Sequence, residues 1–176
     1  MKMEGEEMRK PIRLIGAACS RMGIGKNGQL PWNLPKEFQF FLDTITTVST
    51  PGKKNLVVWG RISWFSCPEA VPPHAHYLCH DFSSAVRLVS HAPLSHIVEN
   101  IWVLGGSEVY RGGLEHPWCD CIYLTEIMAD FDCDVFFPEF DHEVFRKQTG
   151  FPGVPDDIHE ENGIRFQFQV YKKIAN

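Results

Sequence analysis

One carboxylate in the N-terminal part of the chain, Glu37, lies on the apolar face of a predicted helix. Four residues recur with the i, i+3, i+4, i+7 spacing of one helix face, namely Phe38, Phe41, Leu42 and Ile45. Glu37 stands four residues before Phe41, so the two side chains share that face. A carboxylate beside two phenylalanines is partly desolvated, which disfavours its ionised form and raises its pKa. Such a group either forms a buried ion pair or binds and protonates a ligand, and the spacing leaves both alternatives open.

A glycine-rich segment precedes this helix. Residues 23–28 read Gly-Ile-Gly-Lys-Asn-Gly and match G-x-G-x-x-G, and they follow an apolar run over residues 14–19 that predicts a strand. A dinucleotide-binding Rossmann turn requires a helix directly after these glycines, but Pro31 keeps Leu30 out of helical geometry, so this interpretation fails. We predict instead a mobile, glycine-hinged loop at the mouth of a site. The residues that this loop would carry there are Met22, Ile24 and Trp32.

Two other glycine positions each follow a predicted strand and begin a predicted helix, at Gly60 and at Gly105-Gly106. The free N–H groups and the dipole of a helix N-terminus favour a pyrophosphate. Arg61 and Ser63 add a cation and a hydroxyl group at the first junction. The second junction has no side chain, so a cofactor could approach its backbone closely. The alternative is that these glycines only serve tight turns between strand and helix.

The elements that must position these groups alternate along the chain. Strands are predicted over residues 14–19, 55–59, 101–104 and 122–125, and an antiparallel pair over 143–148 and 164–171. Helices are predicted over residues 35–46, with a proline at the start, and after Asp81, with Phe82, Ala85, Val86 and Val89 on the apolar face. This order predicts a three-layer α/β fold whose mostly parallel sheet ends in antiparallel strands. We expect one domain over residues 13–176 after a disordered tail over residues 1–12.

Composition narrows the class of protein. The 176 residues carry a formal net charge of −5, which argues against a broad nucleic-acid-binding surface. No window approaches the roughly 18 apolar residues of a membrane span. Residues 1–10 are charged and lack the apolar stretch of a signal peptide, so we expect a cytoplasmic protein.

Six cysteines raise the question of disulfides or zinc: Cys19, Cys67, Cys79, Cys119, Cys121 and Cys133. Reduced thiols are expected without a secretory signal. The cysteines lack the paired spacing of structural zinc sites, so no metal site is predicted.

From about residue 13 to residue 173 the sequence resembles dihydrofolate reductase. The motifs are Met-Gly-Ile-Gly-Lys-Asn-Gly-x-Leu-Pro-Trp at residues 22–32, an acid before a phenylalanine at residues 37–38, strand-Gly-Arg at Gly60, and strand-Gly-Gly at Gly105. The Pro-Gly-Val and Glu-Glu-Asn-Gly segments near the C-terminus are similar to animal-type members. The resemblance implies NADPH-dependent reduction of 7,8-dihydrofolate to 5,6,7,8-tetrahydrofolate, which supports one-carbon metabolism and thymidylate and purine synthesis. It also implies a monomer that binds dihydrofolate, folate and antifolates.

The resemblance assigns roles to individual residues. Glu37 is implied to receive the pterin ring, Thr125 to hydrogen-bond that acid, and Trp32 to belong to the catalytic group. Other implied pterin contacts are Ile15, Phe38, Phe41 and Leu104. The residues implied to contact NADPH are Ala17, Gly23, Ile24, Gly25, Lys26, Asn27, Gly28, Gln29, Arg61, Ile62, Ser63, Gly105, Gly106, Ser107, Glu108, Val109 and Tyr110.

The chain departs from the family pattern after Glu69, where it passes from Glu-Ala-Val directly to Pro-Pro-His. A loop with an arginine, a whole strand and a Ser-Arg turn are missing at this point. The resemblance implies that the arginine clamps the glutamate tail of folate and that the Ser-Arg turn binds the 2′-phosphate of NADPH. Tyr77-Leu78 could pair with the sheet in place of the lost strand. The alternatives are therefore a non-catalytic paralogue or splice variant with weakened ligand binding, and a module that binds RNA or protein, with the acidic charge against RNA.

Overall fold

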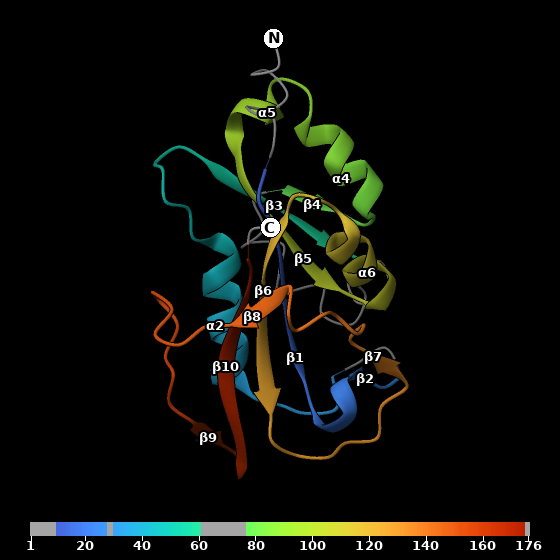
Figure 1. Cartoon of the computed structure of the whole chain (residues 1–176), viewed down its shortest axis with the longest axis vertical. Helices are drawn as coiled ribbons and strands as arrows, with labels where there is room; N and C mark the ends of the chain where they lie inside the picture. The colour runs from blue at the N-terminus through green and yellow to red at the C-terminus, as the bar shows by residue number, and fades with distance from the viewer. Residues whose placement is uncertain (1–9, 28–29, 61–76, 175–176) are drawn as a thin grey trace.

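The computed structural model describes residues 10–27, 30–60 and 77–174, and its centre is one twisted sheet (Figure 1). The strand order is β4-β3-β5-β1-β6-β10-β8, and β9 pairs with β10. The strands are β1 (Ile12–Ala18), β3 (Lys54–Trp59), β4 (Tyr77–Cys79), β5 (Val98–Gly105), β6 (Cys119–Ile127), β8 (Phe145–Lys147), β9 (His159–Glu161) and β10 (Ile164–Lys173). The helices are α2 (Pro35–Thr46), α4 (Phe82–Val89), α5 (Leu94–Ile97) and α6 (Ser107–Glu115), with a short 3-10 turn, η1 (Ser20–Met22).

The sheet confirms the predicted fold class. Strands β4, β3, β5, β1 and β6 are mutually parallel along the sheet, whereas β10 runs antiparallel to β6, β8 and β9. The predicted pairing of Tyr77 at the edge is also confirmed, because Leu56 of β3 lies opposite Tyr77 in parallel register.

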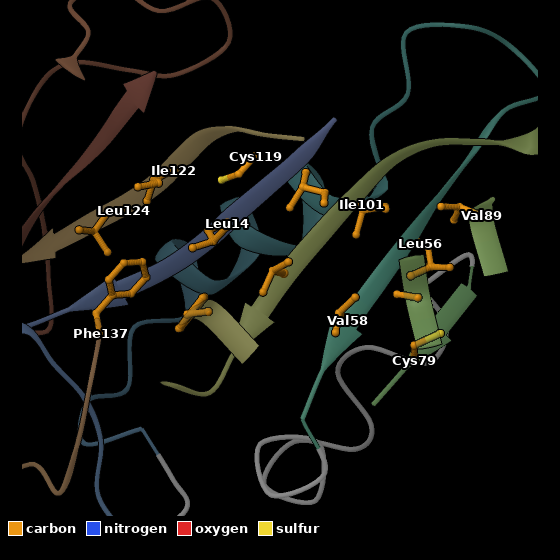
Figure 2. Packing of buried hydrophobic residues seen from close by; sticks show 14 of the residues in the cluster. Leu14, Leu56, Val58, Cys79, Val89, Ile101, Cys119, Ile122, Leu124 and Phe137 are labelled. Carbon is orange, nitrogen blue, oxygen red and sulfur yellow. The ribbon is translucent and has the colours of Figure 1, made fainter. Parts of the chain in front are cut away.

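Side-chain alternation along the strands divides the core into two layers. In β3, Leu56 and Val58 point to the layer under α4 and α6, while Val57 and Trp59 belong to the layer under α2. Figure 2 shows the first layer, where residues from neighbouring parallel strands pack together. In Figure 1, α2 lies on one side of the sheet and α4 with α6 on the other. The three-layer architecture follows from this alternation.

Helix α2 begins and ends where the sequence predicts. Pro35 stands in its first turn, where a missing backbone N–H costs nothing, and Leu42 and Ile45 are buried against the sheet. The predicted cap of α4 is confirmed as well, because Asp81 Oδ1 accepts a hydrogen bond of 2.8 Å from the backbone N–H of Ser84. No helix among the described residues is long and apolar enough to cross a membrane.

The N-terminal boundary differs from the prediction. The disordered tail was expected to reach residue 12, but Ile12 is fully buried in β1. Lys10 is also buried, and its Nζ donates a hydrogen bond of 2.6 Å to the carbonyl oxygen of Ser95. The burial of Ile12 therefore extends the folded part of the chain to this residue at least.

The glycine-rich segment also differs from the predicted hinged loop. Gly23–Gly25 form a short strand, β2, which pairs antiparallel with β7 (Val135–Phe136) in a second sheet. Three backbone carbonyls therefore have partners, since Gly23 accepts from Cys19, Gly25 accepts from Asp134 and Met22 accepts from Phe137. The described residues between β2 and α2 contain no helix, and α2 begins only at Pro35, which confirms that this is not a Rossmann turn.

Candidate active site

Glu37 lies in the first turn of α2 and is buried, with 6% of its surface exposed. Burial raises the pKa of this carboxyl group to about 7, because the charged form loses its hydration. A hydrogen bond from Thr125 on β6 opposes this rise in pKa, and the charge of Glu161 adds to it. Near neutral pH the group is therefore divided between its ionised and protonated forms, which suits a group that both binds and transfers a proton.

The end of β9 and the turn that follows it support the helix that carries Glu37. Both carboxylate oxygens of Glu161 accept a hydrogen bond of 3.0 Å from the backbone N–H of Lys36. Beside it, the side-chain amide of Asn162 donates at 3.0 Å to the carbonyl oxygen of Asn33. A carboxylate at a helix N-terminus is stabilised by the free N–H groups and the helix dipole. No local pattern indicates this pairing, because 125 residues separate Lys36 from Glu161.

Aromatic and aliphatic side chains form an apolar wall around this part of α2. The rings of Phe38 and Phe41 stack at 5.2 Å, and Phe41 meets the edge of Trp59 at 6.4 Å. Both phenylalanines are half-buried and pack on a cluster that includes Ile15 and Leu104. The structure therefore brings together four of the residues that the resemblance assigned to pterin binding.

Tyr110 connects this wall with the end of β5. Its hydroxyl group is buried between two backbone carbonyl oxygens, at 2.7 Å from Ile15 and 2.9 Å from Leu104. Burial raises the pKa of Tyr110, and the charge of Glu37 raises it further, so the tyrosine stays neutral. The sequence assigned Tyr110 to the cofactor only through the resemblance, and its bonds to two strands could not be read from spacing.

The two glycine junctions lie next to each other at the carboxyl edge of the sheet. The backbone N–H of Gly60, after β3, donates at 2.7 Å to the carbonyl oxygen of Gly105, at the end of β5. Gly106 is the N-cap of α6, and no side chain of the described residues caps this helix. A Cβ on Gly60 would lie 3.6 Å from Val109 Cγ2, so this junction packs directly on α6. Predicted residues Arg61, Ile62 and Ser63 lie outside the described ranges.

Other predicted cofactor residues surround these junctions. Ser107 Oγ donates at 2.5 Å to the carbonyl oxygen of Phe136, which ties α6 to β7, and Glu108 is exposed in the first turn of α6. Lys26 forms an ion pair of 3.1 Å with Asp132, and the backbone N–H of Asn27 donates at 3.1 Å to Asp134. Among the predicted residues of this loop, Gly28 and Gln29 lie outside the described ranges.

Trp32 is buried beside the aromatic ring of Phe131, with a centroid distance of 5.6 Å. Its indole Nε1–H is buried and has no acceptor among the described protein atoms. Ala17 of β1 stands opposite Thr125 of β6 in the parallel register, so it is adjacent to the partner of Glu37. Within the described ranges, no group of three or more His, Cys, Asp or Glu side chains is arranged to hold a metal ion.

The structure combines a buried carboxyl group beside an apolar wall with two glycine junctions at the carboxyl edge of a parallel sheet. These features define an α/β protein with an enzyme-like ligand site. The chain belongs to the dihydrofolate reductase family, because the family model described as dihydrofolate reductase matches residues 11–173.

Individual relatives agree with this assignment. Dihydrofolate reductase of Bos taurus is 39% identical over 185 residues, which covers 94% of this chain and 99% of the relative. That of Aedes albopictus is 35% identical over 184 residues, which covers 94% of this chain and 98% of the relative. Among solved structures, Schistosoma mansoni dihydrofolate reductase is similar with a TM-score of 0.80 and 30% identity, and the match covers 94% of this chain and 100% of that one.

The same alignments bear on the segment expected to be missing. Because 94% of the 176 residues is about 165, about 20 of the 185 positions aligned with the Bos taurus protein fall opposite gaps in this chain. This number is of the size expected for one strand with its flanking turns.

Proposed function

We propose that this protein catalyses the NADPH-dependent reduction of 7,8-dihydrofolate to 5,6,7,8-tetrahydrofolate. The observation that carries the proposal is the environment of Glu37, a buried acid with a pKa of about 7 at the edge of the apolar wall. Membership of the dihydrofolate reductase family supports the same reaction. The proposal includes a cytoplasmic location and a monomeric state, as expected from the sequence.

The pterin ring would bind between Glu37 and the apolar wall. In its ionised form the carboxylate accepts two hydrogen bonds from the amidine-like edge of the ring, which is a charge-assisted, bidentate contact. Phe38 and Phe41 supply apolar surface for the ring and for the benzoyl group, and Ile15 and Leu104 supply the floor. The Trp32 indole N–H, which has no acceptor among the described protein atoms, can donate to a ligand or to a bridging water.

The residues around the two junctions fit the cofactor. Gly105 has a φ of +120°, and a Cβ there would lie 3.1 Å from the Tyr110 ring, so only glycine suits this turn. No side chain of the described residues caps α6, so backbone N–H groups at its N-terminus are left for a phosphate. When bound, NADPH supplies a hydride to C6 of the substrate. Gly105, Gly106 and Val109 would hold the cofactor against the end of β5, and Ala17 would face the same space from β1.

The protein's own contribution is positioning and a proton. Hydride addition at C6 requires a proton at N5, and within the described ranges Glu37 is the acid whose environment keeps a proton near neutral pH. Thr125 hydrogen-bonds the carboxyl group and would orient it, and the Tyr110 hydroxyl group contacts a carbonyl oxygen of both β1 and β5.

The direct test is a spectrophotometric assay of NADPH oxidation with purified protein and dihydrofolate. The expected result is turnover that requires both ligands and yields tetrahydrofolate in equal amount. A folded protein that shows no turnover above the buffer rate would contradict the proposal. For the cofactor half, Gly106→Leu places a side chain at the N-cap of α6 and should abolish NADPH binding in calorimetry, and unchanged affinity would remove this junction from the site.

A further inference from the structure

Two cysteines that are distant in the sequence, Cys19 and Cys133, meet outside the candidate active site. Cys19 follows β1, and Cys133 lies two residues before β7. Their Sγ atoms are 3.7 Å apart. A disulfide requires about 2.05 Å between the sulfurs, so the two atoms must approach each other by roughly 1.7 Å. Rotation of the two side chains with small backbone shifts can supply a movement of this size, because the sulfurs are already in contact.

Gly23 makes the room that the sulfurs occupy. A Cβ on Gly23 would collide with Sγ of Cys133, and it would lie 2.7 Å from Cβ of Cys133 and 3.2 Å from Sγ of Cys19. The first residue of β2 therefore covers the thiol pair with bare backbone. Any other residue at this position would push the two sulfurs apart or displace β2.

The thiol pair lies within a set of contacts between two segments, residues 19–27 and residues 129–134. Arg21 pairs with Asp130 at 2.9 Å, and Lys26 pairs with Asp132 at 3.1 Å. Backbone hydrogen bonds run in the same place, from Ser20 N–H to the Ala129 carbonyl, from Asp134 N–H to the Gly25 carbonyl, and from Asn27 N–H to the Asp134 carboxylate. The ion pairs are largely exposed and each stabilises the contact only weakly. A covalent bond between Cys19 and Cys133 would restrain the two segments more strongly than these contacts do.

We propose that Cys19 and Cys133 form a reversible thiol–disulfide pair that reacts with low-molecular-weight disulfides such as glutathione disulfide. The Cys133 thiolate attacks one sulfur of glutathione disulfide, which releases one glutathione and leaves a mixed disulfide on Cys133. The Cys19 thiolate then attacks Sγ of Cys133, forms the Cys19–Cys133 bond and releases the second glutathione. Two protein thiols are oxidised, one glutathione disulfide is reduced to two glutathione molecules, and the two protein protons pass to the released thiolates.

Exposure decides the order of these steps. Cys133 is half-exposed, whereas Cys19 has 5% of its surface exposed and so can act only as the resolving thiol. Burial and the neighbouring Cys19 raise the pKa of Cys133, which makes the first attack faster toward alkaline pH. Under reducing conditions both residues stay thiols, in keeping with the expectation from the sequence.

Other cysteines in the described ranges provide an internal comparison. Cys119 and Cys121 lie on one strand, β6, and both are buried in the sheet. Burial raises the pKa of Cys119 to about 12 and that of Cys121 to about 11, so they offer little thiolate at neutral pH. They should remain reduced in the conditions that oxidise Cys19 and Cys133.

The test is equilibration of the full-length protein in glutathione buffers of graded composition, followed by rapid alkylation of free thiols and peptide mapping. The expected result is a Cys19–Cys133 linked peptide whose amount rises with the disulfide fraction of the buffer, while Cys119 and Cys121 stay alkylated. Cys19→Ser should stop the reaction at a glutathione adduct on Cys133, and Cys133→Ser should prevent the linkage. Absence of the linked peptide across the whole range, or Cys19 linked to another cysteine, would overturn the proposal.

Hydrogen exchange measures the consequence for the two segments. Oxidation should slow exchange of the amides of residues 20–27 in the native protein and leave them unchanged in Cys133→Ser. Equal exchange in the oxidised and reduced protein would overturn the inference that the bond restrains this loop. An effect on turnover rests on the proposed function, but the mapping and the exchange readouts need no activity, so the two proposals fail separately.

Discussion

The hydroxyl group of Tyr110 occupies the space in which a side chain on Gly16 would begin. A Cβ built on Gly16 would collide with the Tyr110 hydroxyl oxygen and lie 3.2 Å from the ring carbon that bears it. The same hydroxyl group contacts the carbonyl oxygens of Ile15 and Leu104, so the glycine in β1 is what lets α6 reach across to both strands. The packing of the candidate active site therefore depends on a residue that has no side chain.

Substitution of Gly16 by alanine should lower the free energy of unfolding by about 1–3 kcal/mol, because the added methyl group overpacks a rigid contact. Urea denaturation measures this change. The matched control is Gly112→Ala in α6, where the new Cβ would lie 3.6 Å from the Phe82 ring in ordinary contact and should not destabilise the protein. In a Tyr110→Phe background the loss caused by Gly16→Ala should shrink, and an undiminished loss would show that the hydroxyl group is not the obstacle.

The negative charge of Glu161 should contribute to the raised pKa of Glu37. Glu161→Gln keeps an oxygen that can accept from the Lys36 N–H but removes a charge that raises the pKa of Glu37. The pKa of Glu37 should therefore fall, and the pH dependence of turnover should move to lower pH. The control is Glu160→Gln on the same strand, where the carboxylate is exposed and pairs only loosely with Arg165 at 3.8 Å. Equal profiles for the two variants would contradict this role of Glu161.

The raised pKa of Glu37 should also appear as a pH dependence of stability. The folded state holds the proton up to about pH 7, compared with an ordinary value of 4.5, so this stabilisation is complete below about pH 4.5 and is lost as pH rises through 7. Glu37→Gln has no such proton. The free energy of unfolding of the variant should therefore rise by about 3 kcal/mol relative to that of the wild type between pH 4.5 and about pH 8. A difference between the two proteins that stays constant with pH would contradict the raised pKa.

Much of the fold could be predicted because several helices and strands have local sequence patterns, such as apolar periodicity and capping residues, that indicate them. The period of Phe38, Phe41, Leu42 and Ile45, with Pro35 at the start, predicted the bounds of α2. Helix α4 likewise follows from Asp81 and its apolar face. These patterns are local, so they survive without knowledge of the rest of the molecule.

The features that the sequence does not predict have a common cause, which is contact between segments that are distant in the chain. Strand β2 was predicted as a hinged loop because its partner, β7, has only two residues and no alternation to reveal it. The support of α2 by Glu161 and the fit of Tyr110 against Gly16 also join residues that are far apart in the chain. Glu37 could be predicted as a site residue because an ionisable group on an otherwise apolar helix face is visible in the local sequence.

The gap in the family pattern should weaken the choice of cofactor and the grip on the folate tail. After Glu69 the sequence has no Ser-Arg pair, and its next arginine is Arg87, whereas the family resemblance implies a Ser-Arg turn and an arginine in this part of the chain. An ionic hydrogen-bonded anchor contributes about 1.5–3 kcal/mol, so its loss should reduce the advantage of NADPH over NADH by roughly 10- to 150-fold compared with family members that have it. Titration of the purified protein with both cofactors measures this ratio.

The same titration with two inhibitors tests the folate tail. A diaminopyrimidine without a glutamate group should retain more of its affinity than an antifolate that depends on its carboxylate. Strong NADPH preference together with tight, carboxylate-dependent binding would mean that other residues have replaced the lost anchors.

The most direct test of the account is the turnover of Glu37→Gln with dihydrofolate and NADPH at neutral pH. The substitution keeps the size of the side chain and removes the proton, so turnover should fall by about 10²- to 10⁴-fold, the usual contribution of a general acid. NADPH affinity, measured by calorimetry on the same preparation, should not change, because Glu37 lies on α2 and the glycine junctions lie at the ends of β3 and β5. Near-normal turnover in this variant, with dihydrofolate still bound, would remove Glu37 from the role on which the proposed function depends.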